Sequence, residues 1–150
     1  MSKNPPPARP GMLVVSHGRL AEELVQAART IVGPVEGLEA LSIDWNDGID
    51  AVQERLVHAV RRLDTGGGVV VATDMFGGTP ANLGLALHEP GRIEIVTGVN
   101  LPMVIKFAGL AGEIGVVEAA GRIAREGRQA IQVASEVLGA AERPPDDPRP

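Results

Sequence analysis

Short apolar runs alternate with amphipathic segments along most of this 150-residue chain. Each run is bounded by glycine or polar residues, and its length suits a strand that is buried on both faces. The pattern predicts four such strands, over residues 12–16, 38–44, 68–73 and 92–98. A further run, "QAIQVA" at 129–134, alternates apolar and polar residues as a strand does, but it is too short for periodicity to distinguish a strand from a helix.

The segments between these runs repeat their apolar residues at the spacing of a helix. This spacing predicts one helix over residues 20–32 and another over 47–63. Asp47 is the predicted N-cap of the second helix, Pro102 suits the first turn of a later helix, and Gly127 is a predicted C-terminal cap. Further helices are predicted over 80–87, 102–110 and 112–126. The two long helices are predicted to bury Leu20, Leu24, Ala28 and Val32 in the first, and Ile49, Val52, Leu56, Val60 and Leu63 in the second.

Strands that alternate with helices indicate an α/β fold, a three-layer sandwich in which helices cover both faces of a four-stranded, mainly parallel sheet. Right-handed crossovers bring the carboxyl ends of all four strands to one edge, and ligands of such sheets bind outside that edge. Proline-rich polar segments flank the pattern. We therefore expect disordered tails over residues 1–10 and 140–150, and one domain over 11–139.

Composition narrows the classes of function. The net charge is −5, aromatic residues are scarce and no long basic cluster appears, which disfavours a nucleic-acid partner. The absence of cysteine excludes disulfides and thiolate metal sites. No apolar stretch approaches the length of a membrane span, and the N-terminus lacks the apolar core of a signal peptide. We therefore expect a cytoplasmic protein without direct membrane insertion.

Candidate chemistry gathers at the carboxyl ends of the predicted strands. His17 follows the first strand, and Asp74 follows the third. Either residue alone is common in a turn, but together they stand at the ends of strands that we expect to be neighbours. A carboxylate that accepts a hydrogen bond from Nδ1–H fixes the imidazole tautomer and leaves Nε2 as a nucleophile. The pair therefore indicates a nucleophilic histidine.

A glycine turn follows the third strand. Gly77, Gly78, Thr79 and Pro80 predict a tight turn and a helix start, with Thr79 as N-cap and Pro80 at the first helical position. Such a start leaves backbone N–H groups directed at the rim, and glycine lets a phosphate approach them closely. With His17 on the same rim, the turn is a candidate phosphoryl-transfer site.

Other known sites fit the chain less well. The phosphate-binding loop GxxxxGK[ST], the dinucleotide motif GxGxxG after the first strand and the nucleophile elbow GxSxG are absent. His17 and Asp74 are too few to form a good metal site, so neither a metal nor another cofactor is expected. His58 and His88 fall on a polar helix face and at a helix end, where we expect solvated or capping side chains.

Three blocks, "VVSHGRLAEELVQAA", "VATDMFGGTPAN" and "TGVNLPM", together resemble the enzyme IIA domain of the mannose-type (mannose/fructose/sorbose) sugar phosphotransferase system. They occur in the order and spacing of that family, and the resemblance covers residues 12–133. It implies a parallel four-stranded sheet that is completed by an antiparallel C-terminal strand from a partner subunit. The resemblance therefore favours the run at 129–134 as an exchanged strand and the protein as a homodimer.

The resemblance also implies roles for the residues at the rim. His17 matches the phosphorylated histidine, which accepts a phosphoryl group from the carrier protein HPr and passes it to an enzyme IIB. Asp74 matches the acid that orients this histidine. The phosphate-binding turn of the family corresponds to Gly77, Gly78 and Thr79 in this sequence. The residues that border the site in the family correspond to Gly18 and Asn100.

Two other functions stay open at this point. A related subunit phosphorylates dihydroxyacetone through its kinase partner, although the three blocks favour the mannose type. A non-catalytic module would sense a phosphorylated metabolite at the same rim, and His17 would then bind the anion without being modified. Arg19 either contacts phosphate or the donor protein, or is a surface residue. A phosphocarrier of this type either feeds sugar transport or regulates metabolism or transcription.

Overall fold

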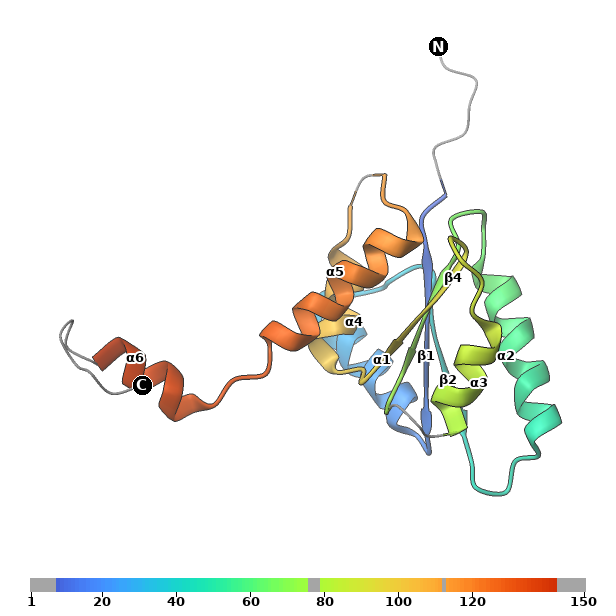
Figure 1. Cartoon of the computed structure of the whole chain (residues 1–150), viewed down its shortest axis with the longest axis horizontal. Coiled ribbons are helices and arrows are strands. Elements are labelled where there is room, and N and C mark those ends of the chain that lie inside the picture. Colours follow the sequence, from blue (N-terminus) through green and yellow to red (C-terminus); the bar gives the residue numbers. More distant parts are fainter. Residues whose placement is uncertain (1–7, 76–78, 112, 143–150) are drawn as a thin grey trace, which may run out of the picture.

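The computed structural model describes residues 8–75, 79–111 and 113–142, with the side chains of all except 79–81 and 140–142. The described part of the chain contains a four-stranded sheet in the order β2–β1–β3–β4, in which every neighbouring pair of strands is parallel. The predicted α/β fold with a parallel sheet is thereby confirmed (Figure 1). The strands are β1 (Gly11–His17), β2 (Leu38–Ile43), β3 (Val69–Thr73) and β4 (Ile93–Thr97).

Helices cover both faces of the sheet (Figure 1). One face carries α1 (Leu20–Val32), α4 (Leu101–Gly109) and α5 (Val116–Gln129), and the other carries α2 (Ile49–Leu63) and α3 (Thr79–Leu87). Successive residues of a strand point to opposite faces of its sheet. Met12 and Val14 of β1 therefore join the core under α1, whereas Leu13 and Val15 join the core under α2.

The buried face of α1 agrees with the prediction only in part: Ala28 is buried, and Leu24 is partly buried against the core. Leu20 and Val32 are about half exposed instead of buried. Ala21 is held against the end of β1, because its backbone N–H donates to the buried Ser16 hydroxyl at 2.6 Å. The buried residues of α1 are Ala21, Val25 and Ala28.

The start of α2 also differs from the prediction. Ile49 is exposed, and Gly48 occupies the N-cap position that was predicted for Asp47. The Asp47 carboxylate instead accepts the backbone N–H of Asp44 at 2.8 Å and lies 3.4 Å from the guanidinium of Arg55. It therefore closes the turn between β2 and α2 rather than the end of the helix.

Gly127 lies inside α5, so its predicted role as a C-terminal cap is wrong. The helix continues to Gln129, and Ala130 is its C-cap residue. A Cβ atom at position 127 would lie 2.6 Å from the sulfur of Met103 in α4. A side chain at position 127 would therefore have to displace the Met103 side chain, and glycine leaves room for the observed packing of α4 against α5.

The last helix, α6 (Ala134–Glu142), stands away from the sheet and its covering helices (Figure 1). Residues 130–133 join it to α5 without regular structure, so the run at 129–134 forms no strand with the described sheet of its own chain. The helix crosses the predicted boundary at 139–140, and the outer parts of the predicted tails, 1–7 and 143–150, lie outside the described residues. Among the described helices, none has both the length and the apolar composition to cross a membrane.

Asp64 joins the amino-terminal ends of β3 and β4. Its Oδ1 accepts the backbone N–H groups of Gly66 at 2.9 Å and Gly68 at 3.1 Å, and its Oδ2 accepts Nε–H of Arg92 at 2.9 Å. The hydrogen bonds from Arg92 and then from the backbone hold the pKa of Asp64 below its usual range, although burial opposes them. The carboxylate thus stabilises the fold in its charged form.

We expect Asp64→Asn to lower the free energy of unfolding by about 1–3 kcal/mol at neutral pH, because these donors lose a charged acceptor. The folded pKa lies below the ordinary value of 3.8. The contribution is therefore present above that value and is lost as the pH falls through the folded pKa. Urea unfolding of Asp64→Asn and of the unmodified protein, at neutral and at acid pH, measures this contribution to the free energy of unfolding. A difference that stayed constant into acid would mean that the carboxylate charge is not its source.

Candidate functional site

Parallel pairing brings the ends of β2, β1 and β3 side by side at one edge of the sheet. In the register of the sheet, His17 pairs with Ile43 of β2, and Val15 pairs with Thr73 of β3. Trp45 in the segment after β2 and Asp74 after β3 therefore approach His17 from the two neighbouring strands.

Asp74 holds His17 by both its backbone and its ring. Oδ2 of Asp74 accepts the backbone N–H of His17 at 2.9 Å and lies 2.7 Å from Nδ1 of the imidazole. Oδ1 accepts the backbone N–H of Met75 at 2.9 Å. The Asp74 side chain is 11% exposed and the His17 side chain 32% exposed. The imidazole is thus fixed on its Nδ1 side and remains partly exposed.

The charge state of Asp74 determines which ring nitrogen of His17 carries the proton. Burial acts to raise the pKa of Asp74, but the hydrogen bonds from His17 and Met75 outweigh it and hold that pKa below its usual range. Asp74 is therefore a carboxylate at neutral pH and can only accept hydrogen bonds. Nδ1 of His17 must then be the donor, which leaves Nε2 of the neutral ring with a free lone pair. In this tautomer Nε2 is the ring atom that can act as a nucleophile.

Ser16 positions His17, a role that the sequence analysis missed. Its fully buried hydroxyl accepts the N–H of Ala21 at 2.6 Å and donates to the carbonyl of His17 at 3.1 Å. Gly18 follows with a φ of +53°, which favours glycine, and its N–H donates to the carbonyl of Ile43 at 2.8 Å. These contacts fix the turn from β1 into α1. The available signal was a small hydroxyl residue directly before His17 and Gly18.

The predicted phosphate-binding turn lies only partly within the described residues. The helix α3 begins at Thr79, shortly after Asp74, as a helix start at this rim requires. Gly77 and Gly78 lie outside the described residues, and so does the side chain of Thr79. Their contact with a phosphate therefore stays a prediction.

Asn100 acts as a cap that joins two helices. Its Oδ1 accepts the N–H of Met103 at 3.2 Å at the start of α4, and its Nδ2 donates to the carbonyl of Gly127 in α5 at 3.1 Å. The preceding residue, Val99, donates its N–H to the carbonyl of Thr73 at 2.8 Å. The loop therefore lies beside the end of β3, while the Asn100 side chain serves the two helices.

The other polar residues that the sequence analysis weighed lie apart from this pair. Arg19 is exposed, and its guanidinium lies 3.5 Å from Glu22 and from Glu23 in the first turn of α1. His58 and His88 each lie near a single glutamate. Within the described part of the chain, no three histidine, aspartate or glutamate side chains gather as a metal site would require.

Trp45 is the second residue at the rim to which the sequence analysis gave no role. Its ring centroid lies 5.8 Å from that of His17, and the two ring planes are tilted by 35°. This separation is typical of interacting aromatic pairs. The side chain is nevertheless 90% exposed. The available signal was the position of the only tryptophan of the chain, directly beyond a strand end.

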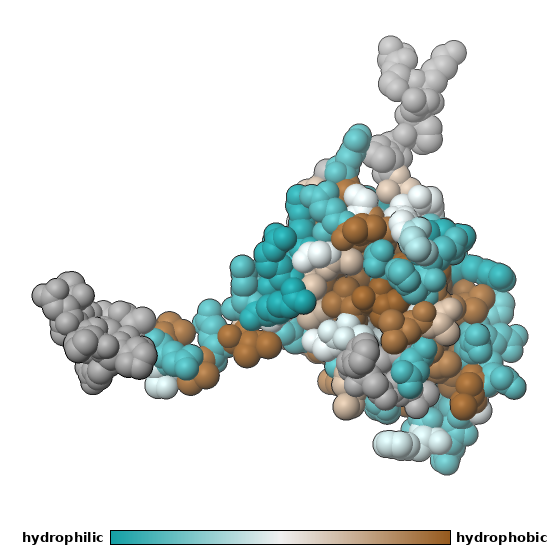
Figure 2. All heavy atoms as spheres, viewed as in Figure 1, coloured by the Kyte–Doolittle hydropathy of each residue, from teal (hydrophilic) through white to brown (hydrophobic). Residues whose placement is uncertain are grey.

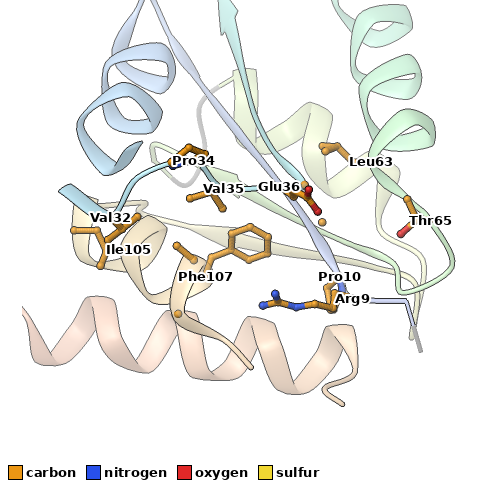
Figure 3. Close-up of a pocket in the computed structure, with 14 residues that line it drawn as sticks. Arg9, Pro10, Val32, Pro34, Val35, Glu36, Leu63, Thr65, Ile105 and Phe107 are labelled. Carbon is orange, nitrogen blue, oxygen red and sulfur yellow. The ribbon is translucent and has the colours of Figure 1, made fainter. Parts of the chain in front are cut away.

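The cavity in Figure 3 lies at the opposite end of the sheet and takes no part in this site. It measures about 620 Å³ and is lined by residues that precede β1 and β2 and by the ends of α1, α2 and α4. Val32, Ile105 and Phe107 contribute apolar surface to it. Arg9 also lines it, and its guanidinium donates to the carbonyl of Leu110.

Comparison with known sequences points to one family. The family model described as PTS system fructose IIA component matches residues 11–124. The fructose-specific EIIA component from Bacillus subtilis (strain 168) is 27% identical over 128 residues, which are 85% of this chain and 88% of that protein. The mannose-specific EIIAB component from Escherichia coli (strain K12) is 26% identical over 96 residues, which are 63% of this chain and 30% of that protein.

Solved structures give the same result. A mannose/sorbose specific IIA subunit from Enterococcus faecalis superposes with a TM-score of 0.74 and 29% identity, over 84% of this chain and 95% of that one. A PTS IIA protein associated with the fucose utilization operon of Streptococcus pneumoniae superposes with a TM-score of 0.78 and 25% identity, over 89% and 98% of the two chains. The segment matched by the family model contains both His17 and Asp74. The chain therefore belongs to the mannose-type family of enzyme IIA components of the sugar phosphotransferase system.

Proposed function

We propose that this protein accepts a phosphoryl group from phosphorylated HPr on Nε2 of His17 and passes it to an enzyme IIB. Family membership supports a phosphocarrier role in the sugar phosphotransferase system, whose EIIA components are phosphotransferases. The observation that supports His17 as the acceptor is its 2.7 Å contact through Nδ1 with the Asp74 carboxylate. That contact leaves Nε2 free.

In the proposed transfer, the lone pair of Nε2 attacks phosphorus in line with the nitrogen of the donor phosphohistidine. A new N–P bond forms as the donor N–P bond breaks, and the donor imidazole keeps the electron pair of the broken bond. The His17 ring gains positive charge while its Nδ1–H remains directed at Asp74. The carboxylate stabilises that charge, so Asp74 favours the phosphorylated state as well as the attack. Transfer to an enzyme IIB reverses these steps.

Phosphoryl transfer needs donors for the oxygens of the moving group. Most of the catalytic effect in such reactions comes from positioning and electrostatics. On this proposal the start of α3 positions the phosphoryl oxygens and stabilises their charge. The first N–H groups of a helix have no partner within the helix and carry partial positive charge. On this proposal the phosphoryl oxygens lie at the turn that leads into Thr79.

The test is incubation with phosphoenolpyruvate, enzyme I and HPr, followed by intact-mass measurement. We expect one phosphoryl group per chain that is labile in acid, because phosphorus bound to nitrogen is acid-labile. Addition of an enzyme IIB should remove it. His17→Ala should abolish the adduct.

His58→Ala and His88→Ala are the matched controls, because both remove an exposed histidine away from the rim. Both variants should be phosphorylated like the unmodified protein. An adduct that persists in His17→Ala would contradict the choice of residue. Phosphate binding without covalent modification would instead favour a sensor of phosphorylated metabolites.

Asp74→Asn should slow transfer from HPr by about 10- to 100-fold, the size of effect seen when the hydrogen-bond partner of a metal-binding histidine is removed. An amide neither fixes the tautomer of His17 nor stabilises its positive charge. Quenched-flow measurement of phosphorylation gives the rate, and circular dichroism verifies the fold. Asp64→Asn is the control, because it removes a carboxylate from the other end of the sheet and should leave transfer unchanged. Equal rates for Asp74→Asn and the unmodified protein would exclude Asp74 from the mechanism.

We also propose that two copies associate through their C-terminal arms, residues 130–142. The edge strand β4 is only partly buried, and a groove of about 440 Å³ runs between it and α5. Figure 2 shows apolar side chains gathered on the face over β4 and on the arm. The exposed apolar side chains of the arm are Ile131, Val133, Val137 and Leu138. An open strand edge readily accepts an additional strand from another chain. On this proposal the arm of each copy completes the sheet of the other.

The association predicts a particle of twice the 15.6 kDa chain mass in light scattering at micromolar concentration. Ile131→Asp combined with Val133→Asp should give a monomer, because buried carboxylates in the groove would be unpaired. Ile31→Asp changes an equally exposed apolar residue on α1 and should leave the dimer intact. A monomeric unmodified protein would contradict the exchange.

A further inference from the structure

The sheet has two edges, and their outward backbone groups have different partners. β2 forms one edge and β4 the other, since the strand order is β2–β1–β3–β4. An edge strand carries N–H and C=O groups that point away from the sheet and can pair with a strand from another chain. The arm of a second copy therefore meets two edges on which a strand can add, although a closed dimer needs only one.

The outward carbonyls of β2 follow from its pairing with β1. The N–H of Met12 donates to the carbonyl of Gly37 at 2.8 Å, and the N–H of Gly18 donates to the carbonyl of Ile43 at 2.8 Å. Because every second residue of a paired strand turns its carbonyl toward the neighbouring strand, the odd-numbered residues from 37 to 43 face β1. The carbonyls that point away from the sheet are those of Leu38, Ala40 and Ser42.

Two arginines cover this row of carbonyls, one from each layer of helices. Arg29 of α1 donates from its guanidinium to the carbonyl of Leu38 at 2.8 Å. Arg55 of α2 donates in the same way to the carbonyl of Ser42 at 3.3 Å. Because α1 and α2 lie on opposite faces of the sheet, the two guanidinium groups reach the edge from both sides. A strand that added to β2 would have to displace both of them.

The middle of this edge is charged. Glu39 of β2 accepts two hydrogen bonds from the guanidinium of Arg62 in α2, at 2.9 and 2.6 Å. Both residues line a hollow of about 410 Å³ together with Arg29 and with Ala40, whose carbonyl is the remaining outward one. An added strand would bury these charges, and charged side chains are one means by which natural sheets prevent pairing at an edge.

Stability alone does not account for these arginine contacts. The side chains of Arg55 and Arg62 are 50% and 61% exposed, and Arg29 is also an exposed residue. Polar contacts of such exposed arginines contribute little to the free energy of unfolding. What the three residues share is their position along the outer side of β2.

The edge at β4 has the opposite character. Ile93 exchanges backbone hydrogen bonds with Glu89 of its own chain, at 2.8 and 3.2 Å, so its N–H and C=O point away from β3. The outward groups further along β4, at steps of two residues, belong to Ile95 and Thr97. Among the described residues, no hydrogen bond reaches these groups. Both residues line the groove in which we place the arm of a second copy.

We propose that Arg29 and Arg55 close the β2 edge to strand addition, so that β4 alone accepts the arm of a second copy. The inference rests on the proposed exchange of arms. Each chain then has one arm to give and one edge to fill, and association ends at two copies. With β2 open, an arm could join another copy at that edge instead, and such head-to-tail contacts form open chains rather than closed pairs.

The test compares Arg29→Ala combined with Arg55→Ala with the unmodified protein, by sedimentation velocity over a series of concentrations. We expect the unmodified protein to remain a dimer. The double variant should form species larger than twice the 15.6 kDa chain mass, in a proportion that rises with concentration. Circular dichroism verifies the fold, and Arg55→Ala alone, which removes only the longer contact, gives the same comparison if the double variant does not fold.

Arg61→Ala combined with Arg125→Ala is the matched control. It removes the same charge from two exposed arginines that make no hydrogen bond to β2 within the described part of the chain, and it should leave the dimer unchanged. Hydrogen exchange read by mass spectrometry locates the new contact. Residues 38–43 should exchange more slowly in the larger species than in the dimer, and addition of Ile131→Asp and Val133→Asp should remove these species.

The outcomes separate the two proposals. A double variant that stays a dimer, or larger species without added protection at 38–43, would overturn the closure of β2 and leave the exchange at β4 standing. An unmodified monomer whose double variant associates through 38–43 would overturn the exchange but support the closure. If both proteins remain monomeric, both proposals are wrong.

Discussion

β1 is paired with a parallel neighbour on each side, and the position of every group at the site depends on that pairing. A strand inside such a sheet is buried on both faces, so its residues are apolar until it leaves the sheet. His17 is the last residue of β1 and the first that is only partly buried. The neighbouring strands end beside it and bring the Asp74 carboxylate within hydrogen-bond distance.

Because a parallel sheet imposes these relations, the sequence was sufficient to predict much of the site. Alternating apolar runs and helical segments identified the four strands, and their alternation implied a parallel sheet. A histidine after the first strand and an acid after the third then had to lie at the same edge. The 2.7 Å contact between His17 and Asp74 is the result that this reasoning required. The sequence pattern did not predict that Asp74 also accepts a hydrogen bond from the backbone N–H of His17.

The features that sequence reasoning missed depend on which partner a residue takes in the fold, sometimes a few residues away and sometimes in another helix. Asp47 looked like a helix cap, but its carboxylate closes the preceding turn. Gly127 was predicted to end a helix, but it lies inside α5 beside the Met103 side chain. Ser16 has its role because the backbone N–H of Ala21, after the turn, donates to the Ser16 hydroxyl. The run at 129–134 needs a strand edge to pair with, and its own chain holds it away from the sheet. A local sequence pattern does not specify a contact that forms only in the folded chain.

A carrier that exchanges partners needs a small interface around its reacting histidine. On the proposed function, donor and acceptor proteins both need Nε2 of His17, so neither can dock until the other has left. A large apolar interface would hold the first partner too long, because most differences in affinity appear in the dissociation rate. Transient interfaces are accordingly small, and a few anchoring residues supply most of their binding energy. Trp45, which is 90% exposed and has its ring centroid 5.8 Å from that of His17, is an exposed side chain of this kind.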